Sequence, residues 1–333
     1  MSEMLAMIRT LGDQLRWARD IEMPALAPSS EILIGGMGGS GIAGDFGAAL
    51  SDRAPGRVAV RKGYDPLPGW VSRVKPTVVA ISYSGNTEET ISLVTAASDA
   101  GLPIVTITTG GQLEKMSSEK GWPSIAVPKG LQPRAAVGYL VGAISRLLAS
   151  FGVLADQTAA LDEAADLVEA TTSDGSEAWS MASELAKSLT GRISIIYGGG
   201  AISGAAAQRW KTQINENAKM PAWWSLLPEL DHNEVVSWET LPSITRGLLG
   251  IVALTDRSDH PRIRARLDHS SALTQSAVPW LAEIPAVGDS DLARLMSLTA
   301  CGDLVSWMLA KEAGVDPVPV ETIEKLKRLL VED

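Results

Sequence analysis

Short apolar runs alternate along the first half of the chain with glycine-rich turns and longer helical stretches. The run over residues 31–35 leads directly into a glycine loop and then a helix. Runs of about four to eight apolar residues bounded by turn residues are typical of buried strands. Each gap between runs is long enough for a crossover helix, so the order predicts an α/β fold with a mainly parallel, doubly wound sheet. Further strands are predicted at residues 58–61, 77–82, 103–106 and 124–127.

The second half repeats the order of strand, glycine loop and helix. Residues 192–198 form an apolar run that leads into Gly199 and Gly200 and then a helix, as happens over residues 31–41. A later run, residues 250–255, ends in a polar loop before another helix. The chain therefore resembles a degenerate tandem duplication of one α/β unit, with one doubly wound parallel sheet in each copy.

The length of 333 residues fits two domains of roughly 100–200 residues each. The N-terminal residues carry acidic side chains among apolar ones, which predicts an amphipathic helix and no signal peptide. The segment between the halves is acidic and alanine-rich, which predicts exposed linking helices. We expect an N-terminal helix over 1–28, a first domain over 29–150, a helical linker over 151–189, and a second domain with a C-terminal helix over 190–333.

Composition excludes several classes of protein. A net charge of −10 without any basic run argues against nucleic-acid binding. No stretch approaches the roughly 18 apolar residues that a membrane helix needs. The single cysteine, Cys301, can form neither an intrachain disulfide nor a zinc motif, which fits a reducing cytoplasm. We expect a cytoplasmic protein that binds neither nucleic acid nor a membrane.

The first glycine loop matches the dinucleotide-binding fingerprint at Gly36, Gly38 and Gly41. That fingerprint also requires an acidic residue at the end of the next strand to hold the ribose hydroxyls. Here the next predicted strand ends in Arg61 and Lys62. A nicotinamide-dependent dehydrogenase is therefore disfavoured, and binding of a nicotinamide nucleotide would reveal one.

The loop after the third predicted strand carries three hydroxyl groups, Ser82, Ser84 and Thr87, around one glycine where a helix begins. Small hydroxyls and free backbone N–H groups form phosphate-binding cradles. An ordinary helix cap would account for one hydroxyl or two. If Ser40 of the first loop reaches the same edge of the sheet, the two loops would jointly enclose a phosphate.

These two loops resemble those of the sugar isomerase (SIS) domain family. Four further segments are similar to the bifunctional phosphoglucose/phosphomannose isomerases, in the same order and over roughly residues 30–330. The segments are residues 133–135, 215–219, 228–234 and 323–327. The resemblance implies that the sugar phosphate is bound by Gly39, Ser40, Ser82, Ser84 and Thr87.

The same resemblance assigns catalytic roles. It implies that Glu216 moves a proton between C1 and C2 while Arg134 lies beside the reacting carbons. His232 is matched to ring opening together with a C-terminal lysine, for which Lys327 fits better than Lys325. One carboxylate can remove and return the proton, and a guanidinium can stabilise the negatively charged cis-enediolate formed in between.

Plainer explanations exist for each of these residues taken alone. Glu216 and Lys219 could form an exposed helix ion pair, and His232 could be a solvated loop residue. Lys327 could interact with a helix dipole, and Arg134 could satisfy a helix start. The catalytic interpretation is preferred because all four motifs occur together in the order that the resemblance requires.

We therefore expect a homodimeric isomerase that interconverts glucose 6-phosphate and fructose 6-phosphate, with mannose 6-phosphate as a further substrate to be tested. A non-catalytic SIS module that senses a phosphosugar is the main alternative, and an aminosugar or shorter sugar phosphate also stays open. No redox cofactor is required. No metal is expected, because only three histidines exist and His260 and His269 fall in a charged helix. The second half lacks the hydroxyl cluster, so one phosphate site per chain is expected.

Overall fold

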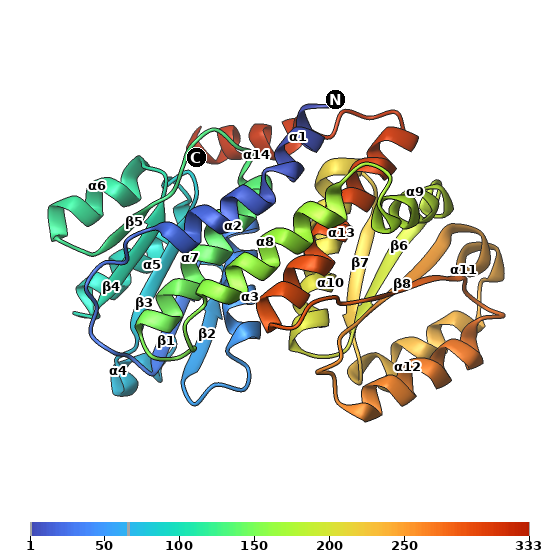
Figure 1. Cartoon of the computed structure of the whole chain (residues 1–333), viewed down its shortest axis with the longest axis horizontal. Helices are drawn as coiled ribbons and strands as arrows, with labels where there is room; N and C mark the ends of the chain where they lie inside the picture. The colour runs from blue at the N-terminus through green and yellow to red at the C-terminus, as the bar shows by residue number, and fades with distance from the viewer. Residues whose placement is uncertain (1, 65–66, 333) are drawn as a thin grey trace.

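The computed structural model describes residues 2–64 and 67–332, and this part of the chain contains two parallel β-sheets (Figure 1). The first sheet has the strand order β2-β1-β3-β4-β5, and the second has the order β7-β6-β8-β9. In each sheet, the strand that comes first along the chain is flanked by the second strand on one side and by the third strand on the other. The strands are β1 (Glu31–Gly35), β2 (Arg57–Arg61), β3 (Thr77–Ser82), β4 (Ile104–Thr108), β5 (Ser124–Ala126), β6 (Ile193–Gly198), β7 (Ala222–Leu226), β8 (Leu249–Thr255) and β9 (Trp280–Pro285).

Helices connect and cover the strands. The first unit, defined here by β1–β5, contains α3 (Gly38–Leu50), α4 (Val71–Val74), α5 (Glu88–Asp99), α6 (Gly111–Lys120), η1 (Pro133–Ala136) and α7 (Val137–Ser150). The second unit, defined by β6–β9, contains α10 (Ala201–Gln213), η2 (Ile214–Ala218), η3 (Glu229–His232), η4 (Glu234–Glu239), α11 (Pro242–Leu248), α12 (Pro261–Thr274) and α13 (Asp291–Glu312). Outside these are α1 (Glu3–Arg9), α2 (Leu11–Asp20), α8 (Thr158–Thr172), α9 (Glu177–Leu189) and α14 (Glu321–Glu332).

The predicted α/β class with two doubly wound sheets is confirmed. Helices cover both faces of each sheet, with α5 and α6 outside the first and α12 outside the second (Figure 1). The hydrophobic pattern does not predict β7 and β9. Both are edge strands, and each lacks a run of β-branched residues, since β7 reads AWWSL and β9 reads WLAEIP.

A continuous apolar core joins the two sheets. Alternate residues of β1 point to opposite faces, so Ile32 and Ile34 pack into this inner core while Leu33 packs under the outer helices. Ile196 of β6 and Val252 of β8 belong to the same inner core, which the helices between the sheets fill. The two units therefore share one hydrophobic interior.

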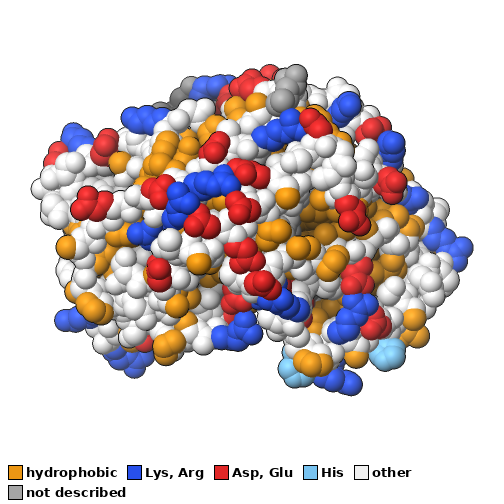
Figure 2. Space-filling model, in the orientation of Figure 1, with side chains coloured by type: hydrophobic (Ala, Val, Ile, Leu, Met, Phe, Trp, Pro, Cys, Tyr) orange, Lys and Arg blue, Asp and Glu red, His pale blue; other side chains and the backbone are white. Residues whose placement is uncertain are grey.

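The expectation that residues 151–189 form exposed linking helices is wrong for one face of α8. Leu161, Ala165 and Val168 are completely buried against the inner core. The opposite face of α8 is charged, and its acidic residues form ion pairs with Arg16 and Arg19 of α2. Figure 2 shows this band of alternating basic and acidic side chains across the surface over α2 and α8. The acidic composition thus describes only the outer half of the helix.

Helices α3 and α10 pack against each other in opposite directions. The start of α3 lies beside η1, whose Arg134 reaches the segment that follows α10. The end of α3 and the start of α10 instead line a shared hollow of about 480 Å³. As a result, the carboxyl edge of the first sheet lies at the same end of the molecule as the amino edge of the second sheet. Within the described ranges, no helix is both long and apolar enough to cross a membrane.

Candidate active site

The two predicted phosphate loops meet at the carboxyl ends of the neighbouring strands β1 and β3. This is the point where the strand order reverses, which is the usual ligand position in such sheets. The backbone N–H of Tyr83 donates to Oγ of Ser40 at 3.1 Å, so the loops are tied together. At Gly39 an added Cβ would lie 2.8 Å from the carbonyl oxygen of Pro133. Glycine at this position therefore allows η1 to approach the loop closely.

The hydroxyl groups of the second loop differ in their surroundings. Ser82 is fully buried, and its Oγ lies 2.8 Å from Oγ1 of Thr87 and accepts the N–H of Gly85 at 3.0 Å. Ser84 is exposed, and its Oγ accepts the N–H of Asn86 at 3.3 Å. Although Thr87 is the N-cap residue of α5, its side chain makes no capping hydrogen bond. A plain capping role does not account for Thr87, and among the described residues the Ser84 hydroxyl has no acceptor of its own, so it can donate to a ligand.

Arg134 lies in η1 next to this cradle with 3% of its surface exposed. Its Nε donates to Oδ1 of Asn217 at 2.8 Å, and its Nη2 donates to the carbonyl oxygens of Pro317 and Val318 at 2.6 and 2.9 Å. Its Nη1 lies 3.6 Å from Oε2 of Glu216. Burial lowers the pKa of Arg134 from its usual value, and the nearby carboxylate of Glu216 opposes this shift.

Glu216 lies in η2, a single π-helical turn at the end of α10, and such turns are frequent at functional sites. Its side chain is partly exposed, whereas the neighbouring Asn217 is fully buried. The plain ion pair between Glu216 and Lys219 is not formed. Lys219 Nζ donates instead to the carbonyl oxygens of Glu216 at 2.5 Å and Pro319 at 2.6 Å. The Glu216 carboxylate is thus left facing Arg134.

Buried polar residues that are not among the predicted catalytic residues support Arg134. Arg209 of α10 donates to the carbonyl oxygen of Arg134 at 3.1 Å and forms an ion pair with Asp303 of α13 at 2.8 Å. Gln213 donates to the same carboxylate at 2.8 Å, and Asn217 donates to Ser306 at 2.9 Å. In the sequence, the signal that could have revealed this network is Asp303, because an acidic residue within the apolar α13 segment needs a buried partner.

His232 is not brought to Glu216 within the chain. The residues flanking Glu216 in η2 pack on the α10 face of the second sheet. Leu230, two residues before His232 in η3, packs on the opposite face with α12. Between η2 and η3 the chain also passes along β7, which spans roughly 13 Å at about 3.3 Å per residue. His232 itself is exposed.

The two candidate lysines lie on α14, which begins shortly after the segment that receives Arg134. Lys325 and Lys327 are both exposed. Residues two apart on a helix point to nearly opposite sides, so only one of them can face a given site. Between them, exposed apolar side chains form a stripe along the helix, consisting of Ile323, Leu326, Leu329 and Leu330.

The remaining cysteine and histidine side chains give little support to a cysteine nucleophile or a metal site. Burial raises the pKa of the Cys301 thiol to about 12, so this residue is a poor nucleophile. His260 is the N-cap of α12, where its Nδ1 accepts the N–H of Arg262 at 3.1 Å. Across residues 2–64 and 67–332, no three His, Cys, Asp or Glu side chains lie close enough together to hold a metal ion.

Comparison with known proteins gives consistent similarities. A family model described as the bacterial phospho-glucose isomerase C-terminal SIS domain matches residues 179–330. The bifunctional phosphoglucose/phosphomannose isomerase of Caldicellulosiruptor bescii is 38% identical over 307 residues, covering 91% of this chain and 90% of that protein. The protein of the same name from Aquifex aeolicus is 36% identical and covers 99% of both chains. The C-terminal domain of glucosamine-fructose-6-phosphate aminotransferase from Francisella tularensis has a similar fold, with a TM-score of 0.72 at 15% identity over 95% of this chain and 97% of that one.

Proposed function

Because the chain belongs to the family of bifunctional phosphoglucose/phosphomannose isomerases and is therefore an isomerase, we propose that it interconverts fructose 6-phosphate with glucose 6-phosphate and with mannose 6-phosphate. The observation that carries this proposal is the position of the Glu216 carboxylate. It lies 3.6 Å from the Arg134 guanidinium, and Arg134 lies beside the cradle formed by the first unit's two loops. The Glu216 carboxylate, the Arg134 guanidinium and the two hydroxyl-bearing loops thus meet where the two units join.

In the proposed reaction the cradle binds the phosphate through Ser84, Thr87 and free N–H groups at the start of α5. Glu216 removes the proton from C2 of the open-chain aldose and returns it to C1, and the hydroxyl proton of O2 moves to O1, which gives the ketose. The cis-enediolate between these steps is negatively charged, and the buried Arg134 guanidinium stabilises it. Arg134 already has its acceptors in place, so little reorganisation is needed when the charge develops.

Ring opening is assigned to His232 and Lys327, and we propose that His232 comes from a second copy of the chain. The support is that η2 and η3 pack on opposite faces of the second sheet, so His232 cannot easily join Glu216 of its own chain. Exposed apolar side chains around η3 and on α14 offer surface for such a homodimer. They include Trp223, Val236, Leu241 and Leu326.

The proposal is tested by a coupled assay of the purified protein with fructose 6-phosphate, in which glucose 6-phosphate and mannose 6-phosphate are detected separately. Both products are expected. Glu216→Gln should abolish their formation, whereas Glu184→Gln, the same change on the exposed surface of α9, should not. Binding of fructose 6-phosphate without any product from the wild-type protein would instead identify a phosphosugar sensor.

A further inference from the structure

The second unit repeats the geometry of the first unit's cradle. In both sheets the loops lie at the ends of the central strand pair, β1 and β3 in the first and β6 and β8 in the second. Helices α3 and α10 have 13 residues each, and Ser40 and Ser203 are the third residue of their helix. Thr87 follows the end of β3 by the same interval as His260 follows the end of β8, and both are N-cap residues.

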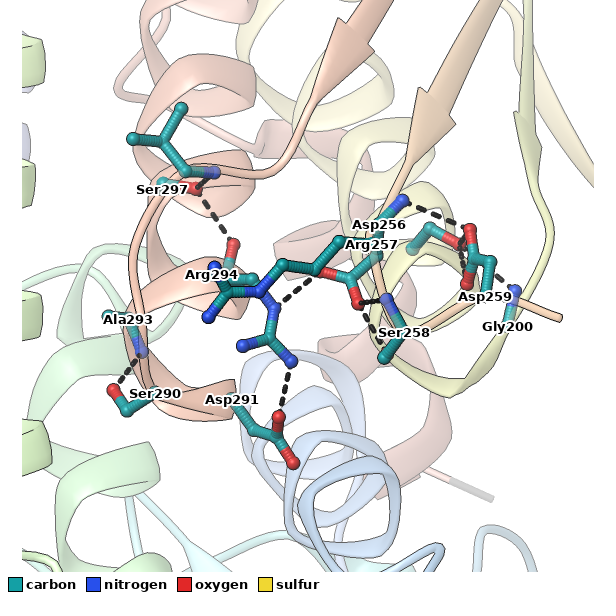
Figure 3. A network of polar contacts seen from close by, with 12 residues as sticks. Gly200, Asp256, Arg257, Ser258, Asp259, Ser290, Asp291, Ala293, Arg294 and Ser297 are labelled. Atoms are coloured by element: carbon teal, nitrogen blue, oxygen red, sulfur yellow. Dashed lines mark hydrogen bonds and ion pairs between the residues drawn. The ribbon is translucent and has the colours of Figure 1, made fainter. Parts of the chain in front are cut away.

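The second cradle holds a carboxylate of the chain itself (Figure 3). Ser203 Oγ accepts the N–H groups of Gly199 and Gly200 at 2.9 and 3.0 Å and donates to Oδ2 of Asp259 at 3.1 Å. The same oxygen of Asp259 accepts the N–H of Asp256 at 3.0 Å, and Gly200 contributes a further backbone hydrogen bond. In the first unit the corresponding N–H, that of Tyr83, donates to Ser40 instead.

The Asp259 carboxylate is bound by uncharged hydrogen-bond donors, the Ser203 hydroxyl and backbone N–H groups. The nearby guanidinium of Arg294 is engaged by Asp256 at 2.7 Å and by Asp291, as Figure 3 shows. The structure places no ion pair on Asp259 in the described ranges. Backbone N–H groups and a serine hydroxyl at the start of helices are also the donors that bind phosphate in proteins. Asp259 therefore occupies its cradle in the manner of a bound anion.

The contact is also close. An added Cβ at Gly200 would lie 2.1 Å from Oδ1 of Asp259, so the carboxylate sits directly against the glycine loop. Two hollows adjoin Asp259, one of about 300 Å³ towards Tyr197 and one of about 310 Å³ towards Arg53. Space is therefore present beside the carboxylate in both hollows.

We propose that the second unit retains an anion-binding cradle of the phosphate type and that the Asp259 carboxylate fills it as an internal ligand. This contact blocks a second sugar-phosphate site on the chain. Removal of the carboxylate should leave the Ser203 hydroxyl and the Asp256 N–H free to donate to a phosphomonoester or inorganic phosphate.

The test compares binding of inorganic phosphate to the wild-type protein and to Asp259→Ala by isothermal titration calorimetry at constant ionic strength. Asp259→Ala should bind one more phosphate per chain than the wild type. Asp259→Asn, which keeps the shape of the side chain, should show no gain. Adding Ser203→Ala to Asp259→Ala should remove the additional binding.

The test compares the number of phosphate ions bound per chain in the variant and in the wild type, so its result does not depend on whether the first cradle binds phosphate as proposed. Equal stoichiometry in folded Asp259→Ala and wild type would overturn the inference. If Asp259→Ala is recovered only as unfolded protein, Asp259→Ser, which supplies one hydroxyl in place of the carboxylate, is measured in the same way and is expected to show the same gain. No gain there overturns the inference as well.

Discussion

The Nε–H of Arg134 donates to Oδ1 of Asn217 at 2.8 Å, although the two residues belong to different units and lie 83 positions apart. Asn217→Ala should leave this buried donor without an acceptor, at a cost of about 1–3 kcal/mol. Because the guanidinium would then be less well fixed, we expect kcat to fall about 10-fold to 100-fold with a smaller change in KM. Ser306→Ala is the matched control, because it removes the acceptor of Asn217 Nδ2 and the bond from Ser306 to the Asp303 carbonyl but leaves the contact between Asn217 and Arg134 in place. Equal losses in both variants would contradict a specific role in positioning Arg134.

Glu216→Gln keeps the shape of the side chain but removes the base. It should bind fructose 6-phosphate almost as well as the wild type while losing both isomerisation and exchange of the C2 proton with deuterated solvent. NMR of the sugar phosphate in D₂O measures this exchange directly. Exchange at near wild-type rate would exclude Glu216 as the base.

Ser84 and Thr87 are expected to bind the phosphate, each through a hydrogen bond to a charged group. Ser84→Ala and Thr87→Ala should each weaken fructose 6-phosphate binding by about 1.5–3 kcal/mol, and inorganic phosphate should compete. Ser92→Ala, later on the same helix α5, serves as the control. Unchanged affinity in the Ser84→Ala, Thr87→Ala double variant would contradict the cradle assignment.

A site shared between two chains should allow complementation. Glu216→Gln and His232→Ala homodimers should each be nearly inactive on the cyclic substrate. After mixing and subunit exchange, up to about a quarter of the sites would carry both wild-type residues, by the statistics of random pairing in a two-fold dimer. Recovered activity is measured against the unmixed samples. Absence of recovery despite verified subunit exchange would place His232 and Glu216 of one chain in the same site.

The Arg209–Asp303 pair behind Arg134 is buried, with side-chain exposures of 1% and 5%. Asp303→Asn leaves the guanidinium without its counter-charge and should lower the free energy of unfolding by about 3–5 kcal/mol. Urea denaturation measures the change. Glu119→Gln removes the carboxylate from the exposed pair with Lys115, 3.9 Å apart, and should cost less than about 1 kcal/mol. Similar losses in the two variants would show that burial of the Arg209–Asp303 pair is not decisive.

The parts of the site that follow directly on strands could be predicted from the sequence. The loops after β1 and β3 carry their glycines and hydroxyls at fixed offsets, and the parallel order places them at one edge. The acceptors of Arg134 could not be predicted, because Asn217 and Pro317 lie 83 and 183 positions away and nothing local marks them. The same holds for His232, since the face of the sheet to which a loop returns depends on packing and not on its own residues.

The carbonyl oxygens of Pro317 and Val318 that receive Arg134 lie 183 and 184 positions after it in the sequence. During synthesis, the cradle and Arg134 are therefore made long before the acceptors that fix the guanidinium. A polypeptide that stops before residue 317 would contain every predicted phosphate-binding residue and Glu216, yet its arginine would be buried without two of its hydrogen bonds. Premature termination before residue 317 should thus yield products that still bind the sugar phosphate but turn it over poorly, so turnover depends on residues made after the whole predicted phosphate cradle.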